Sequence, residues 1–286
     1  MTRATLVDVL GPALDKGYAV AGFVCLGWED ARAYATAAER ECAPVILQVG
    51  PGARGHMPLP IWARMLGTLA DQASVPVVIH LDHSKDISEC ESAIQLGFTS
   101  VMFDGSDLAL DENIDRTRQV VQMAHRAGVS CEGEIGYVGY DNGAASLGTQ
   151  VHEATQFAHN TGVDAMAISI GNVHLQQSQK AVIDYDRLSK IQSVTPVPLV
   201  LHGGSGIAHQ DRIKLASTSN VCKFNMGTEL RQVFGQSLRK TLAQSPNEFD
   251  RIKILHTTEA PLCAEAQKII RELGPVKKIN CWGALV

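Results

Sequence analysis

The sequence contains no tract of basic residues and no long hydrophobic run. Across 286 residues, 25 Lys and Arg side chains stand against 30 Asp and Glu side chains, which gives a formal net charge of −5. Nucleic acids and anionic membrane surfaces are bound through clustered positive charge, which this composition does not supply. A membrane-spanning helix needs roughly 18 or more consecutive apolar residues, and no such run occurs. We therefore expect neither a nucleic-acid partner nor a membrane partner.

Cysteine is too scattered to build a disulfide framework or a cysteine-rich metal site. The seven cysteines are odd in number, and no two of them form a Cys-x-x-Cys pair. A reducing compartment, the cytoplasm, is therefore the expected location. A secretory signal is not expected either, because Asp8 and Asp15 interrupt residues 1–20, whose pattern is that of an amphipathic helix.

Short apolar segments recur along the chain and alternate with segments of helical periodicity. The apolar segments are 18–25, 44–49, 75–81, 98–103, 129–135, 163–170, 197–202 and 221–226. Several are apolar throughout, which is typical of parallel strands covered on both faces. Helical spacing is found at 28–42, 59–73, 85–96, 111–128, 151–161, 208–218 and 228–243.

This alternation of strands and helices predicts a parallel sheet. Eight repeats favour a closed barrel over an open doubly wound sheet. No Gly-x-Gly-x-x-Gly motif follows the first strand, which disfavours a dinucleotide-binding fold. We predict an α/β fold in which residues 1–286 form one (β/α)8 TIM barrel with additional terminal helices.

Three histidines stand at or just after the ends of three different predicted strands. They are His83, His174 and His202. The carboxyl ends of the strands carry the active site in barrels of this kind. Three imidazoles that converge beside an open position are typical of catalytic zinc. A lone histidine is more often a packed or surface residue, and spacing alone leaves the two alternatives about equal.

Three carboxylates accompany these histidines. Asp82 directly precedes His83, so it could exchange a proton with a substrate oxygen or orient a neighbouring ligand. Asp104 and Glu134 end adjacent strands, where they could bind a second cation or simply be hydrated. His80 lies inside its strand, and we expect it to pack or to support a ligand.

Two glycine-bearing turns follow the last two predicted strands. The first is His202-Gly-Gly-Ser-Gly206, and the second is Asn225-Met-Gly-Thr228. Barrel enzymes often bind phosphate at these two places, through free backbone N–H groups and a helix N-terminus. Glycines more often serve tight turns. The pairing of the two turns beside a predicted metal site nevertheless favours a phosphate site.

Together these motifs resemble the class II, metal-dependent ketose-bisphosphate aldolases, most closely the fructose- and tagatose-bisphosphate aldolase branch. The similarity covers roughly residues 1–240 and is carried by several motifs in the same order. They are VVIHLDHS (77–84), SVMFDGS (100–106), EGEIG (132–136), LVLHGGSG (199–206) and KFNMGTEL (223–230).

The resemblance implies an aldehyde-lyase that reversibly cleaves a phosphorylated ketose to dihydroxyacetone phosphate and an aldehyde through a zinc-stabilised enediolate. It implies zinc on the three strand-end histidines, and Asp82 as the catalytic acid/base. It implies a second divalent or monovalent cation position at Asp104 and Glu134. A homodimer or homotetramer is the assembly that it suggests. The residues that it assigns to the dihydroxyacetone phosphate half of the substrate are Gly203, Gly204, Ser205, Asn225, Gly227 and Thr228.

The chain departs from the pattern of the family around the aldehyde half of the substrate. Leu175 follows the middle histidine, where glycine is usual, and Gly50 stands where a small hydroxyl residue is common. Val24 lies in a stretch that usually contains asparagine. The segment 136–148 is short, and Asp141 is its single acid. We therefore expect the metal centre and the triose-phosphate site to follow the family, while the sugar stays open.

Other functions remain open on the sequence alone. An epimerase or isomerase could use the same enediolate without breaking a carbon–carbon bond. A non-catalytic paralogue could keep only the sugar-phosphate site. A Schiff-base aldolase is less consistent with the sequence, because Lys223 is the only lysine near the end of a predicted strand.

Overall fold

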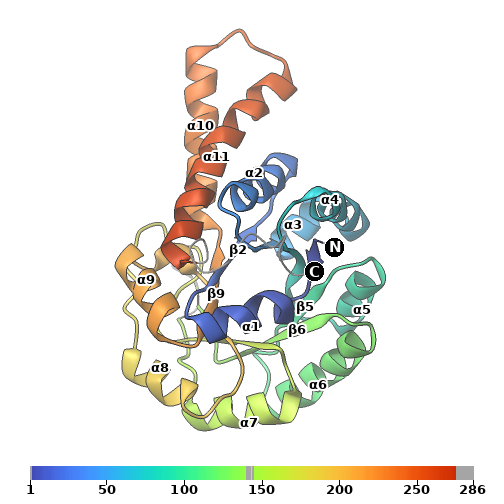
Figure 1. Ribbon diagram of the computed structural model, residues 1–286, viewed down its shortest axis with the longest axis vertical. Helices are drawn as coiled ribbons and strands as arrows, with labels where there is room; N and C mark the ends of the chain where they lie inside the picture. Colours follow the sequence, from blue (N-terminus) through green and yellow to red (C-terminus); the bar gives the residue numbers. More distant parts are fainter. Residues whose placement is uncertain (1, 140–142, 144, 275–286) are drawn as a thin grey trace.

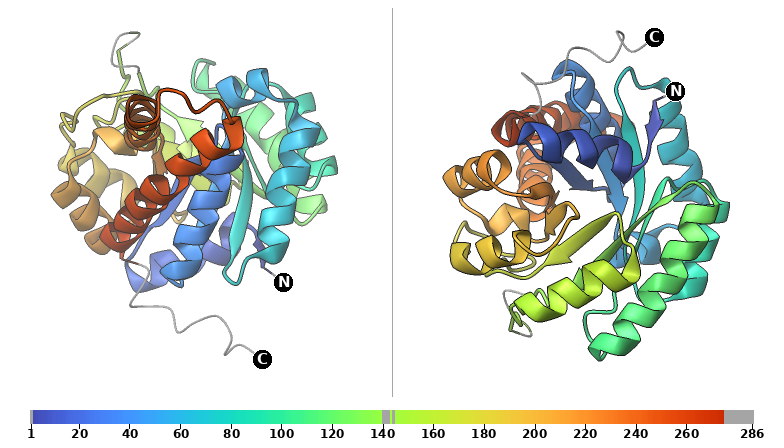
Figure 2. Two further views of the ribbon diagram at one scale, coloured as in Figure 1. Left: turned by 90° about the horizontal axis from the view of Figure 1, so that it is seen from above. Right: turned by 60° about the horizontal axis from the view of Figure 1, so that its bottom comes forward.

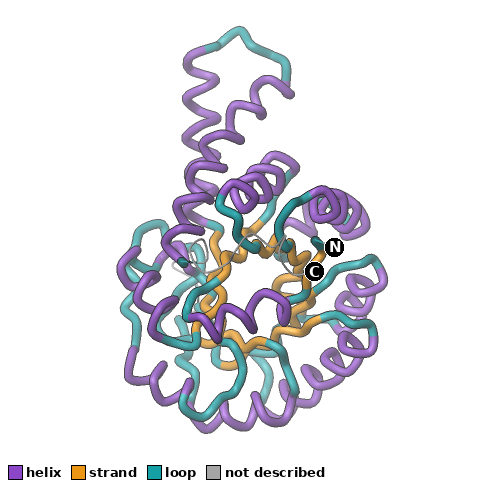
Figure 3. Tube along the Cα trace, in the orientation of Figure 1, coloured by secondary structure: helices purple, strands orange, loops and turns teal. Residues whose placement is uncertain are grey.

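The computed structural model describes residues 2–139, 143 and 145–274, and its parallel strands close into a ring (Figure 3). The ring consists of β2 (Val20–Val24), β3 (Val45–Val49), β4 (Val77–Ser84), β5 (Ser100–Phe103), β6 (Ser130–Ile135), β7 (Ala165–Ile168), β8 (Leu199–Leu201) and β9 (Val221–Met226). Pairing of β2 with β9 and of β4 with β5 completes the circle. The fold is therefore a (β/α)8 TIM barrel, and all eight predicted strands are confirmed to within three residues.

Helices follow the strands around the outside of the barrel (Figure 1). They are α2 (Trp28–Arg40), α3 (Pro51–His56), α4 (Leu59–Gln72), α5 (Ile87–Gln95), α6 (Leu110–Arg126), α7 (Val151–Thr161), α8 (Tyr185–Gln192), α9 (His209–Thr218) and α10 (Thr228–Gln244). Two of these, α3 and α8, escaped the sequence prediction. Both are short, and α8 buries only Leu188 and Ile191, which is too little for a clear helical period.

An additional helix closes the amino-terminal end of the barrel (Figure 2). In α1 (Leu6–Lys16), the buried residues Leu6, Val9, Leu10 and Ala13 form one apolar face. This face packs against strand residues that point into the barrel: Val20, Ile46, Val78, Ala165, Ala167, Val200 and Cys222. A two-residue strand, β1 (Arg3–Ala4), precedes this helix and pairs with β4. The closed amino-terminal end leaves the opposite end, where the predicted site residues lie, open to a substrate.

The second terminal addition is α11 (Arg251–Leu273), which packs against α2 and α10. The ends of α10 and α11 that are joined by their connecting loop project beyond the outline of the barrel (Figure 1). The first turn of α10 nevertheless lies at the barrel mouth, where Thr228 lines the central pocket. The predicted additional helices at both ends are thus confirmed.

Two further sequence predictions can be compared with this fold. None of the helices in the described part of the chain combines the length and the apolar character needed to cross a bilayer. No disulfide joins the six cysteines within residues 2–274 that the structure describes, and the seventh, Cys281, lies outside the described residues.

Candidate metal centre and active site

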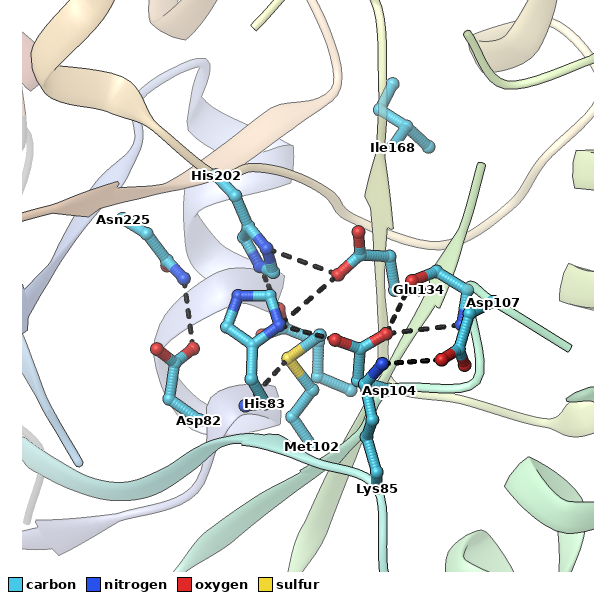
Figure 4. A network of polar contacts seen from close by, with 12 residues as sticks. Asp82, His83, Lys85, Met102, Asp104, Asp107, Glu134, Ile168, His202 and Asn225 are labelled. Atoms are coloured by element: carbon cyan, nitrogen blue, oxygen red, sulfur yellow. Dashed lines mark hydrogen bonds and ion pairs between the residues drawn. The ribbon is translucent and has the colours of Figure 1, made fainter. Parts of the chain in front are cut away.

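The three histidines singled out in the sequence meet at the carboxyl end of the barrel. His83 lies on β4, whereas His174 and His202 follow β7 and β8. Their ring centroids are 4.5 Å apart for His83 and His202, 5.1 Å for His83 and His174, and 5.6 Å for His174 and His202. One nitrogen of each ring lies within 4.8 Å of the others. Figure 4 shows His83 and His202 side by side, with acidic residues around them.

The donor atoms of this cluster fit a metal ion. Nε2 of His83 and Nδ1 of His202 are buried; the first has no hydrogen-bond partner within the described residues, and the second makes no hydrogen bond of regular geometry there, although Oε2 of Glu134 lies 3.3 Å from it. Buried polar atoms normally have partners, so such orphans indicate a missing one. Burial alone would lower the pKa of His202, but Glu134 and Glu132 raise it to about 10. The position therefore stabilises positive charge, and three imidazoles are one of the ligand sets found in catalytic metal sites.

A second group of possible ligands consists of His83, Asp104 and Glu134. Nδ1 of His83 donates a 2.7 Å hydrogen bond to Oδ2 of Asp104, and Oε2 of Glu134 lies 3.6 Å from the same nitrogen. Burial would raise the pKa of Asp104, but His83 and Ser106 hold it well below its ordinary value. An ionised Asp104 fixes the proton of His83 on Nδ1, which leaves Nε2 available to a metal.

Beneath His202 lies an ion pair that is entirely buried. Nε2 of His202 is 3.0 Å from Oε1 of Glu132, and Nζ of Lys223 is 2.6 Å from Oε2 of the same carboxylate. Burial would raise the pKa of Glu132, but Lys223 and His202 lower it further than burial raises it. The ionised Glu132 accepts the Nε2 proton of His202, so that Nδ1 faces the centre. Lys223 also approaches His80, which hydrogen-bonds to Ser100.

The carboxylate of Asp82 lies on the other side of His83 from Asp104 (Figure 4). Nδ2 of Asn225 donates a 3.1 Å hydrogen bond to its Oδ1 atom. Burial would raise the pKa of Asp82, but the neighbouring imidazoles of His83 and His202 lower it overall. An ionised carboxylate in this place can accept a proton from a bound substrate.

A β-bulge lets two consecutive residues reach the same mouth. Leu81 pairs with Val101 and Ser84 with Phe103, so β4 carries one more residue than β5 across this stretch. Side chains of a regular strand alternate between its two faces. The bulge, with His83 at a φ of 51°, allows both Asp82 and His83 to line the central pocket.

The central pocket has a volume of about 270 Å³ and extends from Asp82 to the two glycine-bearing turns. Five of the six predicted substrate residues line it: Gly203, Ser205, Asn225, Gly227 and Thr228. Gly204 is instead packed underneath, where an added Cβ would lie 2.6 Å from Met226. Oγ of Ser205 accepts hydrogen bonds from the backbone N–H groups of Gly227 and Glu229, which joins the two turns.

The residues that depart from the pattern of the family also lie around this pocket. Val24, Gly50 and Leu175 line it, and Arg231 contributes a cationic side chain from α10. Leu175 has a φ of 57°, in the left-handed region that favours glycine. Asp141 lies outside the described residues. The lining of the pocket thus adds small and apolar side chains and one arginine to the predicted site residues.

Comparison with known proteins identifies the lineage of this barrel. The sequence model of class II fructose-bisphosphate aldolases matches residues 4–278. The chain belongs to this family. The aldolase is 35% identical to the fructose-bisphosphate aldolase of Geobacillus stearothermophilus, over 96% of this chain and 98% of that protein. It is 34% identical to the sulfofructosephosphate aldolase of Alkalicoccus urumqiensis, over 96% of this chain and 97% of that protein.

A solved structure agrees with this assignment. The crystal structure of the YdjI aldolase from Escherichia coli K12 superposes with a TM-score of 0.83 at 28% identity, covering 97% of this chain and 99% of that chain. The family is metal-dependent, so this protein is a metal-dependent aldolase, and it is a lyase of carbohydrate metabolism.

Proposed function

We propose that this aldolase reversibly cleaves a phosphorylated ketose to dihydroxyacetone phosphate and an aldehyde, with zinc as its metal. The observation that carries the proposal is the convergence of three imidazoles beside Asp82, in a pocket that ends at two glycine-bearing turns. A ketose phosphate needs these three elements: a cation for its oxygens, a proton acceptor, and an anion site.

In this proposal His83, His174 and His202 hold the metal. Zinc, when bound, supplies Lewis-acid stabilisation of the negative charge that develops as the carbon–carbon bond breaks. Asp104 and Glu132 keep His83 and His202 in the tautomers that direct a free nitrogen to the centre. Glu134, whose Oε2 atom lies 3.3 Å from Nδ1 of His202, offers an alternative cation position together with Asp104.

Asp82 acts as the acid/base. In the cleavage direction its carboxylate takes the proton of the C4 hydroxyl, and the electron pair of the O–H bond forms the aldehyde carbonyl as the C3–C4 bond breaks. The electron pair of the C3–C4 bond stays with the C3 fragment as an enediolate, which takes up a proton to become dihydroxyacetone phosphate. In condensation the same carboxyl returns the proton. The hydrogen bond from Asn225 fixes the orientation of the carboxylate. Its lowered pKa keeps it ionised near neutral pH, as a proton acceptor must be.

The triose-phosphate half binds at the opposite end of the pocket. The turn at Gly203 and Ser205 lines the same pocket as the start of α10, where Gly227 caps a helix of 17 residues that begins at Thr228. A helix N-terminus attracts anions through its unpaired N–H groups and dipole. Arg231 lies one turn further along α10 and adds positive charge. Gly204 takes part by allowing the turn to pack closely on β9.

The aldehyde partner remains open within this proposal. The two relatives compared above carry names with different sugars, fructose bisphosphate and sulfofructosephosphate, at nearly the same identity. We further propose a homodimer or homotetramer of single-domain subunits, each formed by residues 1–286, and a cytoplasmic location. The odd number and scattered positions of the cysteines support this location.

Removal and return of the metal test the proposal. Purified protein is treated with a chelator and assayed against a panel of ketose phosphates for release of triose phosphate, before and after addition of zinc. We expect cleavage of at least one ketose to vanish and to return. Full activity after removal of every divalent ion would contradict the proposal. Proton exchange without cleavage would favour the epimerase or isomerase, and binding without turnover would favour the non-catalytic paralogue.

A further inference from the structure

The bulge that presents Asp82 and His83 disturbs the hydrogen bonding of the barrel. Two residues of β4 lie between the pairs Leu81–Val101 and Ser84–Phe103, where β5 has one. A bulge leaves backbone groups outside the regular ladder, and His83 also adopts the left-handed conformation, which is strained for a residue other than glycine. Such a segment keeps one geometry only when neighbouring groups hold it.

The guanidinium of Arg54 holds this segment from behind. Nη1 donates hydrogen bonds of 2.6 Å to the carbonyl of Val49 and of 2.7 Å to the carbonyl of Asp82. Nη2 donates one of 3.2 Å to the carbonyl of His83. Both carbonyls of the bulge are therefore bonded to one rigid group, which also fixes them to the end of β3.

The remaining donors of Arg54 are engaged with Glu89. Nε lies 2.8 Å from Oε1 and Nη2 lies 3.0 Å from Oε2, and Ser84 Oγ also donates to Oε2. All five N–H groups of the guanidinium thus have acceptors, and the side chain is only 9% exposed. Arg54 does not line the pocket, whereas Pro51, Gly52 and Ala53 of the same helix do. Its place is behind the pocket wall, out of reach of a substrate.

We propose that Arg54 is a positioning residue that holds the Asp82–His83 bulge and so aims the acid/base and one metal ligand at their common centre. The roles of Asp82 and His83 in this inference rest on the proposed function. Lysine cannot replace the arginine, because an ammonium offers its three donors from one point and cannot span three carbonyls and a carboxylate. Without the planar guanidinium, the carbonyls of Asp82 and His83 lose their hydrogen-bond donors, and the side chains of these two residues lose their fixed orientation.

The test compares R54K with R271K. Arg271 also forms a two-point contact with Glu41, but its side chain is 61% exposed and none of its hydrogen bonds within the described residues reaches the bulge, so R271K controls for the change from arginine to lysine itself. Zinc affinity is measured by calorimetry, and the absorption spectrum of the Co²⁺-loaded protein reports ligand geometry. We expect R54K to bind zinc about 10–100-fold more weakly, with an altered spectrum, because groups that orient ligands have effects of this size. R271K should match the wild type in both.

Kinetics and rescue complete the test. With saturating metal, kcat of R54K should fall by about 10–100-fold with little change in KM, because the aim of Asp82 and not substrate binding is lost. Millimolar guanidinium should restore part of kcat and of the Co²⁺ spectrum to R54A. If R54K lowers only the melting temperature and leaves zinc affinity, spectrum and kcat unchanged, Arg54 is merely structural and the inference is overturned.

The metal readouts keep this test separate from the proposed function. If the wild type cleaves no ketose, zinc affinity and the Co²⁺ spectrum of R54K still decide the role of Arg54. If the wild type is a zinc aldolase and R54K matches it in every measurement, only the inference about Arg54 fails.

Discussion

The buried pair of Lys223 and Glu132 makes the stability of the barrel sensitive to a single substitution. Both side chains have no exposed surface, and their charged atoms are 2.6 Å apart. K223M removes the ammonium and leaves the carboxylate buried beside His202. Loss of one partner of a buried ion pair costs about 3–5 kcal/mol, whereas removal of both charges is often close to neutral. We therefore expect K223M to lower the free energy of unfolding by about 3–5 kcal/mol and K223M/E132Q to recover most of it.

Urea unfolding of the chelator-treated protein measures both variants without a contribution from metal binding. K240M is the matched control, because Lys240 lies exposed on α10, and surface changes of this kind are usually within about 0.5 kcal/mol. The double variant should regain stability without regaining zinc affinity, since an amide at position 132 no longer fixes the tautomer of His202. A loss below about 1 kcal/mol in K223M, or a double variant as unstable as the single one, would refute the reasoning.

Three further predictions concern other parts of the molecule. Burial raises the pKa of Asp30 to about 6 from 3.8, so folding favours its protonated form, and the contribution of this carboxyl to stability is lost as the pH rises through 6. Between pH 4 and pH 7.5, the free energy of unfolding of D30N relative to that of the wild type should therefore rise by about 1–3 kcal/mol in urea titrations. A stability difference between D30N and the wild type that does not change with pH would contradict this. G203A should abolish triose-phosphate binding and lower the melting temperature well beyond G128A, because both positions have positive φ but only a Cβ at 203 would clash with the carbonyl of Val173. Equal binding of triose phosphate by both variants in calorimetry would argue otherwise. H83A should lose zinc and cleavage together, measured by elemental analysis and triose-phosphate release, and retained zinc would count against its role.

The strands and most helices could be predicted because each carries its own local signal. Continuous apolar segments such as 44–49 and 221–226 indicate buried parallel strands, and long amphipathic patterns indicate the outer helices. Local signals fail for α3 and α8, which are too short to repeat a helical period. The closure of the barrel was predicted from the number of repeats, because eight strand–helix units are typical of a closed TIM barrel.

The site was predictable where strand ends carry chemistry and unpredictable where geometry depends on distant partners. The three histidines follow from their positions in the alternation. The pairing of Glu132 with Lys223 spans 91 residues, so no local pattern reveals it, although Glu132 and Glu134 are spaced to share one side of β6. The bulge at Asp82 could not be predicted either, because one additional residue in a strand does not change its pattern of apolar residues recognisably. Arg54 acquires its role only through that bulge.

The adjacency of Asp82 and His83 has a consequence for how this enzyme can diverge. A single peptide unit joins the proposed proton acceptor to one of the candidate metal ligands, so any shift of the backbone there moves both together. The two glycine-bearing turns, where we propose that the phosphate binds, follow β8 and β9, and other residues of the pocket follow β2 and β3. Substitutions after those four strands can therefore change the recognition of the sugar one residue at a time, whereas Asp82 and His83 on β4 must be kept or lost together.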